Sequence, residues 1–357
     1  MESTEKKTIL VAPLDWGLGH ASRCIPIIRH FVQTGHNVLL AGNGRSAELL
    51  RIEFPLLPLF TDIPDYAITY PENENFTIHF IKNSFRLLKI IRDEQQWLNH
   101  FLNQQKVDWV ISDNRYGLHN PAVKTFFITH QLHIPAPGYL RALTNFINRS
   151  FIHRFNLCLV PDFAGEQNLS GALSHGKHNY NNLRYIGPLS RFGEFKGIPD
   201  HDILAHEQRP IHNLHSPQYQ YEFTILISGP EPARTHFRAL VVKLFAQTNK
   251  PCIMIEGKTE KKETEVIGNL TIAPHLPESE FREKLLSSRY IICRSGYSTI
   301  MDLYYLGKKA LLVPTPGQPE QLYLARLHNM PDDHAELEQQ KLAASSLDDL
   351  LHIITKR

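Results

Sequence analysis

The segment from Tyr290 to Asp302 reads YIICRSGYSTIMD and predicts a short strand, a tight turn and the start of a helix. The apolar pair Ile291-Ile292 belongs to the strand, and Ser295-Gly296 makes the turn. A helix N-terminus presents unpaired N–H groups and a partial positive charge, which together bind anions. Ser295 is a candidate N-cap, and Gly296 lets a phosphate group approach the backbone closely. The segment therefore predicts a phosphate site at the start of this helix.

Polar side chains gather on one face of the same helix. They stand at positions i, i+3, i+4 and i+7, and they are Ser295, Ser298, Thr299 and Asp302. The carboxylate of Asp302 would repel a phosphate, but it can accept hydrogen bonds from vicinal hydroxyls such as those of a ribose. The alternative is an ordinary Ser-capped helix that follows a buried strand and binds no ligand.

A second polar loop follows the next apolar stretch, residues 310–313. It reads PTPGQPEQ and ends in Glu320 and Gln321, which could hold sugar hydroxyls. Packing does not require this composition, so the loop favours a ligand-binding role for both segments.

These two segments resemble the nucleotide-sugar site of GT-B glycosyltransferases of family 28, the group that contains the lipid II N-acetylglucosaminyltransferase. The resemblance covers most of the chain and implies an α/β fold of two Rossmann-like domains that face an interdomain cleft. It also implies that residues 274–276, which include His275 and Leu276, border the nucleotide base. The donor-binding residues expected on this basis are Gly229, Arg234, His275, Leu276, Ser295, Gly296, Ser298, Thr299, Asp302, Glu320 and Gln321.

Strands and helices alternate along both halves of the chain, which is typical of a parallel sheet covered on both faces. Apolar runs predict strands at 8–12, 36–41, 109–112, 126–129, 157–160, 223–227, 251–255, 270–273, 290–293 and 310–313. Helices are expected at 22–33, from 46, at about 78–103, from 233 and from 337 onward. The expected organisation is an acceptor-binding domain at 1–192, a linker at 193–220, a nucleotide-sugar domain at 221–335, and a C-terminal helix at 336–357 that packs back toward the first domain.

A glycine loop follows the first strand, with the spacing Gly17-x-Gly19-x-x-Ser22. A dinucleotide site would need an acidic residue at the end of the second strand, but residues 40–43 read LAGN, which disfavours NAD. The loop instead resembles the glycine-histidine segment of the lipid II enzyme. Gly17, Gly19 and His130 are therefore expected to bind the acceptor.

Two residues compete for the role of general base, and His130, which follows the predicted strand at 126–129, is a third candidate that suits acceptor binding better. His20 has an ordinary pKa near neutrality, and Asp113 follows a strand at the sheet edge where ligands bind. Asp113 could also orient His20, and His20 could simply bond to the backbone. Arg234 and Arg294 could offset the charge of a diphosphate.

Composition narrows the function classes. The chain has 357 residues, 42% hydrophobic content and a net charge of +2, which indicates two globular domains without a bulk attraction to nucleic acid. Four widely spaced cysteines, a polar N-terminus and the absence of a long apolar run favour a cytoplasmic enzyme, at most bound to the inner face of a membrane. Basic and apolar residues alternate between 139 and 155, which suits an anionic membrane surface.

No metal or cofactor is expected, because the one Asp-x-Asp motif, at 200–202, falls in the linker. The resemblance implies transfer of N-acetylglucosamine or a related hexose from a UDP-sugar to an unidentified acceptor, lipid-linked or of the cell envelope, with inversion. Two alternatives stay open: a UDP-sugar epimerase on the same fold, and a non-catalytic nucleotide-sugar-binding protein. The sequence departs from the lipid II enzyme at Asp302, where glutamate is usual, and in the first glycine loop.

Overall fold

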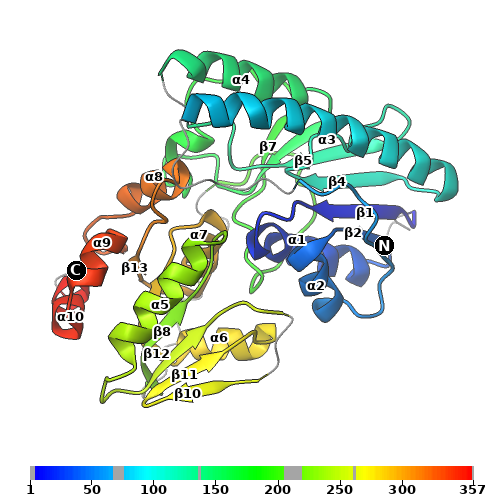
Figure 1. Ribbon diagram of the computed structural model, residues 1–357. Coiled ribbons are helices and arrows are strands. Elements are labelled where there is room, and N and C mark those ends of the chain that lie inside the picture. Colours follow the sequence, from blue (N-terminus) through cyan, green and yellow to red (C-terminus); the bar gives the residue numbers. More distant parts are fainter. Residues whose placement is uncertain (1–4, 67–75, 136–137, 205–218, 260–262, 356–357) are drawn as a thin grey trace. The chain divides into compact units, whose positions relative to one another are not determined.

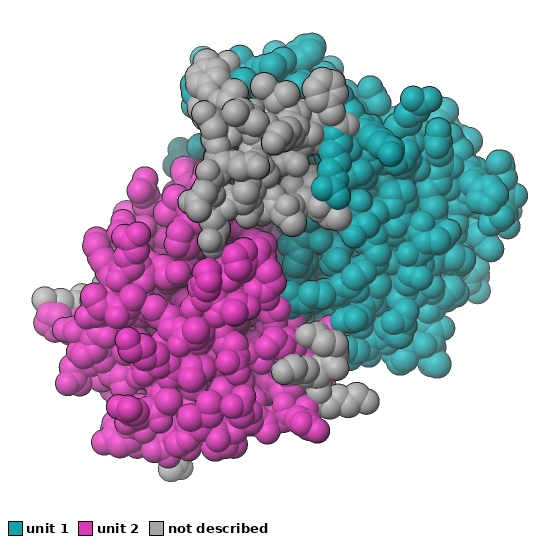
Figure 2. Space-filling view, viewed as in Figure 1, with its two compact units in different colours: residues 1–208 teal, residues 209–357 magenta. Residues whose placement is uncertain are grey.

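The computed structural model describes residues 5–66, 76–135, 138–204, 219–259 and 263–355. The chain divides into two compact units, residues 1–208 (unit 1) and residues 209–357 (unit 2), coloured separately in Figure 2. Within the described residues, each unit is built around its own seven-stranded sheet. The prediction of two α/β domains with Rossmann-like sheets is confirmed.

Unit 1 contains a fully parallel sheet in the order β3-β2-β1-β4-β5-β6-β7. Its strands are β1 (Thr8–Pro13), β2 (Asn37–Ala41), β3 (Leu59–Phe60), β4 (Trp109–Asp113), β5 (Lys124–Ile128), β6 (Leu157–Val160) and β7 (Leu183–Tyr185). Its helices are α1 (Leu18–Gln33), α2 (Gly44–Glu53), α3 (Phe76–Gln104), α4 (Gly138–Ile152) and the short 3-10 turn η1 (Gly171–Leu173).

Helices cover both faces of this sheet, with α1 and α2 on one side and α3 and α4 on the other (Figure 1). The central strands therefore have no solvent-facing side, which explains why they read as continuous apolar runs. Ile9, Leu10 and Val11 of β1, for example, are fully buried.

Unit 2 repeats the design with the order β10-β11-β9-β8-β12-β13-β14, in which only the β10–β11 pair is antiparallel among the described strands. The strands are β8 (Tyr221–Leu226), β9 (Cys252–Ile255), β10 (Glu265–Ile267), β11 (Leu270–Ala273), β12 (Ser288–Cys293), β13 (Leu311–Leu312) and β14 (Ala335–Glu336). The helices are α5 (Ala233–Phe245), α6 (Glu278–Leu286), α7 (Tyr297–Leu306), α8 (Pro319–Leu327), α9 (Gln339–Ala344) and α10 (Leu347–Thr355).

The unit boundary differs from the expected one, 1–192 with a linker at 193–220. Phe195 is buried against the rings of His30 and Phe31, and Ile203 bonds through its backbone to Tyr185 and Ala164. Residues 193–204 therefore pack on unit 1, because their apolar side chains find partners there. The rest of the expected linker, up to residue 218, lies outside the described residues.

The C-terminal tail packs within unit 2, and its expected packing toward the first domain stays a prediction. Leu350 of α10 is fully buried in the core of unit 2, and Leu347, Leu351 and Ile354 pack against the same core. The apolar face of α10 is therefore covered within unit 2.

Candidate functional site

The first group of candidate residues lies where the strand order of unit 1 reverses, between β1 and β4. These strands pair in parallel with Pro13 opposite Asp113, so the chain segments that follow them emerge side by side. Ligands of open α/β sheets bind at the carboxyl ends of strands at such a switch point. The helix α1 that follows β1 carries His20 in its first turn, because it begins at Leu18, four residues earlier than expected.

Asp113 is fully buried at this edge and bonds to two basic side chains. One carboxylate oxygen lies 2.7 Å from Nδ1 of His20, and the other accepts a 2.5 Å hydrogen bond from Nε of Arg23. A second Arg23 nitrogen donates to the oxygen that faces His20. Burial alone would raise the pKa of Asp113. The charges and hydrogen bonds of Arg23 and His20 outweigh this effect and lower that pKa to about 2. Asp113 is therefore ionised.

This geometry favours one tautomer of His20. Its Nδ1 has two neighbours: the ionised Asp113 oxygen at 2.7 Å, which needs a proton on Nδ1, and Nη2 of Arg23 at 2.9 Å, which could instead donate to Nδ1. Because that Arg23 nitrogen also donates to the same Asp113 oxygen, the shorter contact favours hydrogen on Nδ1, which leaves Nε2 as an acceptor. Burial, followed by the charge of Arg23, lowers the pKa of His20 below 6.5. Neutral His20 can thus take a proton at Nε2. Of the two predicted bases, the geometry favours His20 as base and Asp113 as the group that orients it.

Arg23 also reaches His130, the predicted acceptor residue that follows β5. Its Nη1 donates to Nδ1 of His130 across 3.1 Å, so Nε2 of His130 carries the hydrogen and can donate to a ligand oxygen. Sequence reasoning missed Arg23. The available signal was its i+3 spacing from His20 on a predicted helix, which places both side chains on one face.

Hydrogen bonds from neighbouring segments fix the glycine loop between β1 and α1. Gly17 caps α1 with φ of 90°, a conformation that favours glycine, and a Cβ there would meet no atom within 4 Å. Asp15 accepts a 2.9 Å bond from the backbone N–H of Ser46 in the first turn of α2, and Arg115 donates to the carbonyl of Pro13. Gly19 lies in α1 rather than in the loop.

The second group lies at the corresponding switch point of unit 2, between β8 and β12, where Leu226 pairs with Cys293. Gly229 follows β8 with φ of 106°, and the turn Ser295-Gly296 follows β12. Gly296 has φ of −74°, which any residue adopts, and a Cβ on it would meet no atom within 4 Å. Neither backbone strain nor packing explains this glycine, which agrees with close approach of a ligand.

The N-cap of α7 is Gly296, with no side-chain cap, so the prediction of Ser295 as N-cap is wrong. Ser295 is fully buried, and its hydroxyl donates to the carbonyl of Gln321 across 2.7 Å because α8 packs directly beside it. Ser298 and Thr299 are half-buried in the first turn of α7, and Asp302 is buried one turn further on.

Glu320 and Gln321 lie in the first turn of α8, not on a loop as expected, because Pro319 starts the helix at N1. The amide of Gln321 accepts from the backbone N–H of Thr315 and donates to Gln318. Gln321 therefore shapes the preceding loop, while Glu320 is half-buried.

The remaining predicted donor residues surround these two loops. Arg234 is buried in α5, where it donates to the carbonyl of Glu256 and pairs with Glu231. His275 and Leu276 are half-buried between β11 and α6. All of them belong to segments that follow the carboxyl ends of strands of unit 2 or begin the helices after them.

Comparison with known proteins agrees with this geometry. Residues 232–355 match the model of glycosyl transferase family 1. CalG4, the calicheamicin glycosyltransferase, superposes with a TM-score of 0.61 at 11% identity, over 99% of this chain and 91% of its own. MurG of Acinetobacter baumannii superposes with a TM-score of 0.52 at 11% identity, over 98% of this chain and 90% of its own. VinC, solved in complex with dTDP, superposes with a TM-score of 0.56 at 13% identity, over 98% of this chain and 91% of its own. No curated protein matches the chain by sequence.

The whole chain has the fold of the GT-B glycosyltransferases, and its residues 232–355 match a glycosyltransferase family by sequence. The sequence match concerns unit 2, and the structural likeness concerns the fold of the whole chain. The narrower grouping with family 28 stays a prediction.

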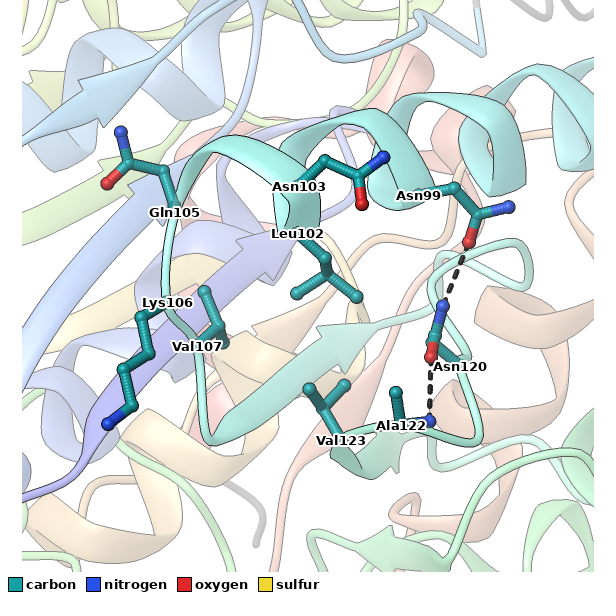
Figure 3. A pocket seen from close by; sticks show the side chains of 9 residues that line it. All are labelled: Asn99, Leu102, Asn103, Gln105, Lys106, Val107, Asn120, Ala122 and Val123. Carbon is teal, nitrogen blue, oxygen red and sulfur yellow. Dashed lines mark hydrogen bonds between the residues drawn. The ribbon is translucent and has the colours of Figure 1, made fainter.

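Two other features of the described residues are unsuited to catalysis. A shallow pocket lies between the C-terminal end of α3 and the start of β5 (Figure 3). It opens at the amino ends of the strands, away from Asp113, and the amide of Asn120 is bonded to Asn99 and to the backbone of Ala122.

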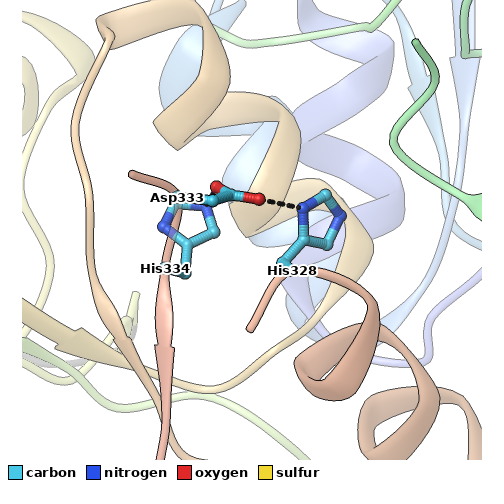
Figure 4. A group of neighbouring side chains, drawn as sticks. All are labelled: His328, Asp333 and His334. Atoms are coloured by element: carbon cyan, nitrogen blue, oxygen red, sulfur yellow. Dashed lines mark hydrogen bonds and ion pairs between the residues drawn. The ribbon is translucent and has the colours of Figure 1, made fainter. Parts of the chain in front are cut away.

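The second feature brings His328, Asp333 and His334 together in unit 2 (Figure 4). Nδ1 of His334 accepts the backbone N–H of Ala310, so its Nε2 carries the hydrogen and points at the carboxylate of Asp333, 3.6 Å away. A metal would need the lone pair of that same nitrogen. The hydrogen-bonded arrangement therefore fits a structural link between β13 and β14.

Proposed function

We propose that this GT-B glycosyltransferase moves a hexose, N-acetylglucosamine or a related sugar, from a UDP-sugar to a hydroxyl acceptor, with inversion and without a metal. The observation that carries the proposal is the pair of switch points: an Asp113-oriented His20 in unit 1, and the open N-terminus of α7 at Gly296 in unit 2. The first supplies a base, and the second a site for the diphosphate.

In the proposed reaction, Nε2 of His20 takes the proton of the acceptor hydroxyl as its oxygen attacks the anomeric carbon of the donor. The bond from that carbon to the diphosphate breaks, and the nucleoside diphosphate leaves with the electron pair. The charge on Asp113 stabilises the imidazolium that forms, and Nε2–H of His130 donates to the acceptor.

A nucleoside diphosphate donor is supported by two of the similar structures, VinC with dTDP and SsfS6 with thymidine diphosphate. The choice of UDP for this chain depends on Asp302. Its carboxylate is proposed to accept hydrogen bonds from both ribose hydroxyls, and a deoxyribose offers only one of them.

The test is a screen of UDP- and dTDP-sugars for transfer, with release of nucleoside diphosphate as the signal and mass spectrometry of the products. We expect turnover with a UDP-sugar, and binding of UDP at least tenfold tighter than binding of dUDP. Equal binding of UDP and dUDP would remove the role given to Asp302. Conversion of a UDP-sugar to its epimer without any acceptor would establish the epimerase instead.

We also propose that unit 1 binds an anionic membrane surface through α4, which suits a lipid-linked acceptor. Leu143 and Phe146 are 51% and 58% exposed, on a helix whose sequence contains no acidic residue. Arg149 lies over the ring of Phe146, 5.9 Å from its centre. No described helix combines the length and hydropathy needed to cross a bilayer.

Vesicle sedimentation tests this surface. We expect binding to phosphatidylglycerol vesicles, weaker binding to phosphatidylcholine, and loss of binding in Leu143→Ser/Phe146→Ser. Leu56→Ser is the matched control, because Leu56 is 95% exposed elsewhere on unit 1. Equal sedimentation with both lipids, or equal effects of the two variants, would contradict the proposal.

A further inference from the structure

Asn114 directly follows Asp113 at the end of β4 and has an uncommon backbone conformation. Its φ is 58°, in the left-handed region that few residues other than glycine adopt. Its backbone N–H donates to the carbonyl of Ile128 across 3.2 Å, and Ile128 ends β5 two positions before His130. The fold therefore holds Asn114 at the same edge of the sheet as the proposed base, His20.

The side chain of Asn114 has an unused hydrogen-bonding group. Its amide oxygen is buried and has no hydrogen-bond partner among the described residues. An unpaired buried acceptor is costly, and most such groups in proteins have partners. The residue as a whole is only half-buried, so a rotation of the amide turns this oxygen toward a ligand. A hydroxyl of the ligand would supply the missing donor.

Trp16 lies on the β1 side of this edge, in the loop between β1 and α1. It is 43% exposed, and its ring packs at 90° to the ring of the buried Tyr66, with 6.4 Å between the ring centres. The preceding backbone is fixed, because the N–H of Leu14 donates to the carbonyl of Asp113 across 3.0 Å. The loop therefore presents a flat apolar surface at the edge where ligands of such sheets bind.

This combination of groups separates two classes of hydroxyl acceptor. A planar phenol offers one hydroxyl, which the base would take, and it would leave Asn114 and His130 unused. A sugar ring carries several hydroxyls at its rim and a face of C–H groups that can pack against an aromatic ring. A sugar ring therefore provides partners for the amide, the imidazoles and the indole together.

We propose that Asn114 and Trp16 form a subsite for a sugar ring, and that the acceptor of this chain is a carbohydrate. The amide oxygen of Asn114 accepts a hydrogen bond from a hydroxyl beside the reacting one, and the ring of Trp16 packs against the C–H face. The inference rests on the proposed function and deepens it, because it names the class of acceptor.

The experiment measures transfer from the UDP-sugar found in the screen to the methyl glycosides of glucose, galactose and N-acetylglucosamine, with umbelliferone as the phenol. Trp16→Ala should raise the KM of the glycoside acceptor at least tenfold, and Trp16→Phe, which keeps a ring, less than about threefold. Asn114→Gly keeps the backbone conformation and removes the amide, and it should also raise this KM at least tenfold. The affinity for UDP should stay unchanged in all three variants.

Two substitutions in unit 2 are matched controls. Tyr219→Ala removes a ring of nearly equal exposure, 44%. Asp332→Gly removes the side chain of the second non-glycine residue with a positive φ among those described. Neither should change the KM of the glycoside acceptor.

Several outcomes overturn the inference. They are a lower KM for umbelliferone than for any glycoside, a glycoside KM within twofold of the wild-type value in Trp16→Ala or Asn114→Gly, and a parallel loss of UDP affinity in these variants. If no glycoside is a substrate, tryptophan fluorescence decides, because Trp16 is the most exposed of the three tryptophans. Glycosides should change the emission of the wild-type chain and not that of Trp16→Phe. A chain that binds UDP but no glycoside overturns this inference alone, whereas one that binds no nucleotide overturns the proposed function as well.

Discussion

Replacement of Asp113 by asparagine isolates the orientation of His20 from the rest of the site. Asparagine has nearly the same size and can still accept one bond from Arg23, but it cannot hold the proton of Nδ1 with a full charge. Without that charge the imidazole is free to adopt the tautomer with hydrogen on Nε2, which cannot act as a base. General base catalysis contributes about 10²–10⁴-fold, so kcat should fall by that factor, about 3–5 kcal/mol of barrier.

Stability must be separated from catalysis, because the substitution leaves the buried charge of Arg23 without its carboxylate. Loss of one partner of a buried pair costs about 3–5 kcal/mol. Asp162→Asn is a matched control: Asp162 is also fully buried, follows β6 of the same sheet, and bonds to His175 across 3.3 Å. It should lower the melting temperature without the loss of kcat.

The assay is release of nucleoside diphosphate with the donor and acceptor found in the screen, together with the affinity for UDP. Asp113→Asn should bind UDP as the wild-type chain does, because the donor residues belong to unit 2. Histidine ¹⁵N shifts should show the His20 resonance change from the Nδ1–H to the Nε2–H tautomer. A variant that keeps kcat within about threefold of the wild-type value, or a control with an equal loss, would refute the role given to Asp113.

Three further predictions follow from the charges in each unit. The value of kcat/KM should rise as pH rises through the pKa of His20, because only the neutral imidazole can act as base. The midpoint should lie below 6.5, because burial and the charge of Arg23 lower that pKa. Arg23→Gln removes this charge and should move the same rising limb to higher pH, while a limb that stays in place would exclude His20 as the titrating base. Burial lowers the pKa of His334 from 6.5 to about 4. Between these values the unfolded chain binds a proton at this histidine and the folded chain does not. The corresponding free energy of unfolding, about 3 kcal/mol, is therefore present above pH 6.5 and lost as pH falls through 4. His334→Asn, which keeps an acceptor for the Ala310 N–H, should flatten urea stability between these values, and an unchanged slope would contradict this.

The fold was largely predictable because its strands are long apolar runs with helices between them. β6, at Leu157–Val160, agrees with the prediction at both ends, and β1 extends one residue beyond it. The strands at Leu59–Phe60 and Ala335–Glu336 could not be found in this way, since two residues carry no periodicity. The start of α1 was missed because the helix was expected to begin at Ser22, whereas Gly17, with its positive φ, caps a helix that begins at Leu18.

The site was predictable in its residue types and less so in its contacts. Sequence reasoning named His20 and Asp113 but left their roles open, because the decision depends on the 2.7 Å distance between them and on the buried Arg23. It placed Gln321 among the sugar contacts, whereas its amide is bonded to Thr315 and Gln318. Such bonds join residues several positions apart in loops, and no periodic pattern reveals them.

The most direct test of the whole account is the titration of UDP into the wild-type chain, His20→Ala and Asp302→Ala, with EDTA present. We expect binding without metal, the same affinity in His20→Ala despite its loss of turnover, and at least tenfold weaker binding in Asp302→Ala. Absence of binding in the wild-type chain, or equal losses of UDP affinity in both variants, would contradict the division between a catalytic site in unit 1 and a donor site in unit 2.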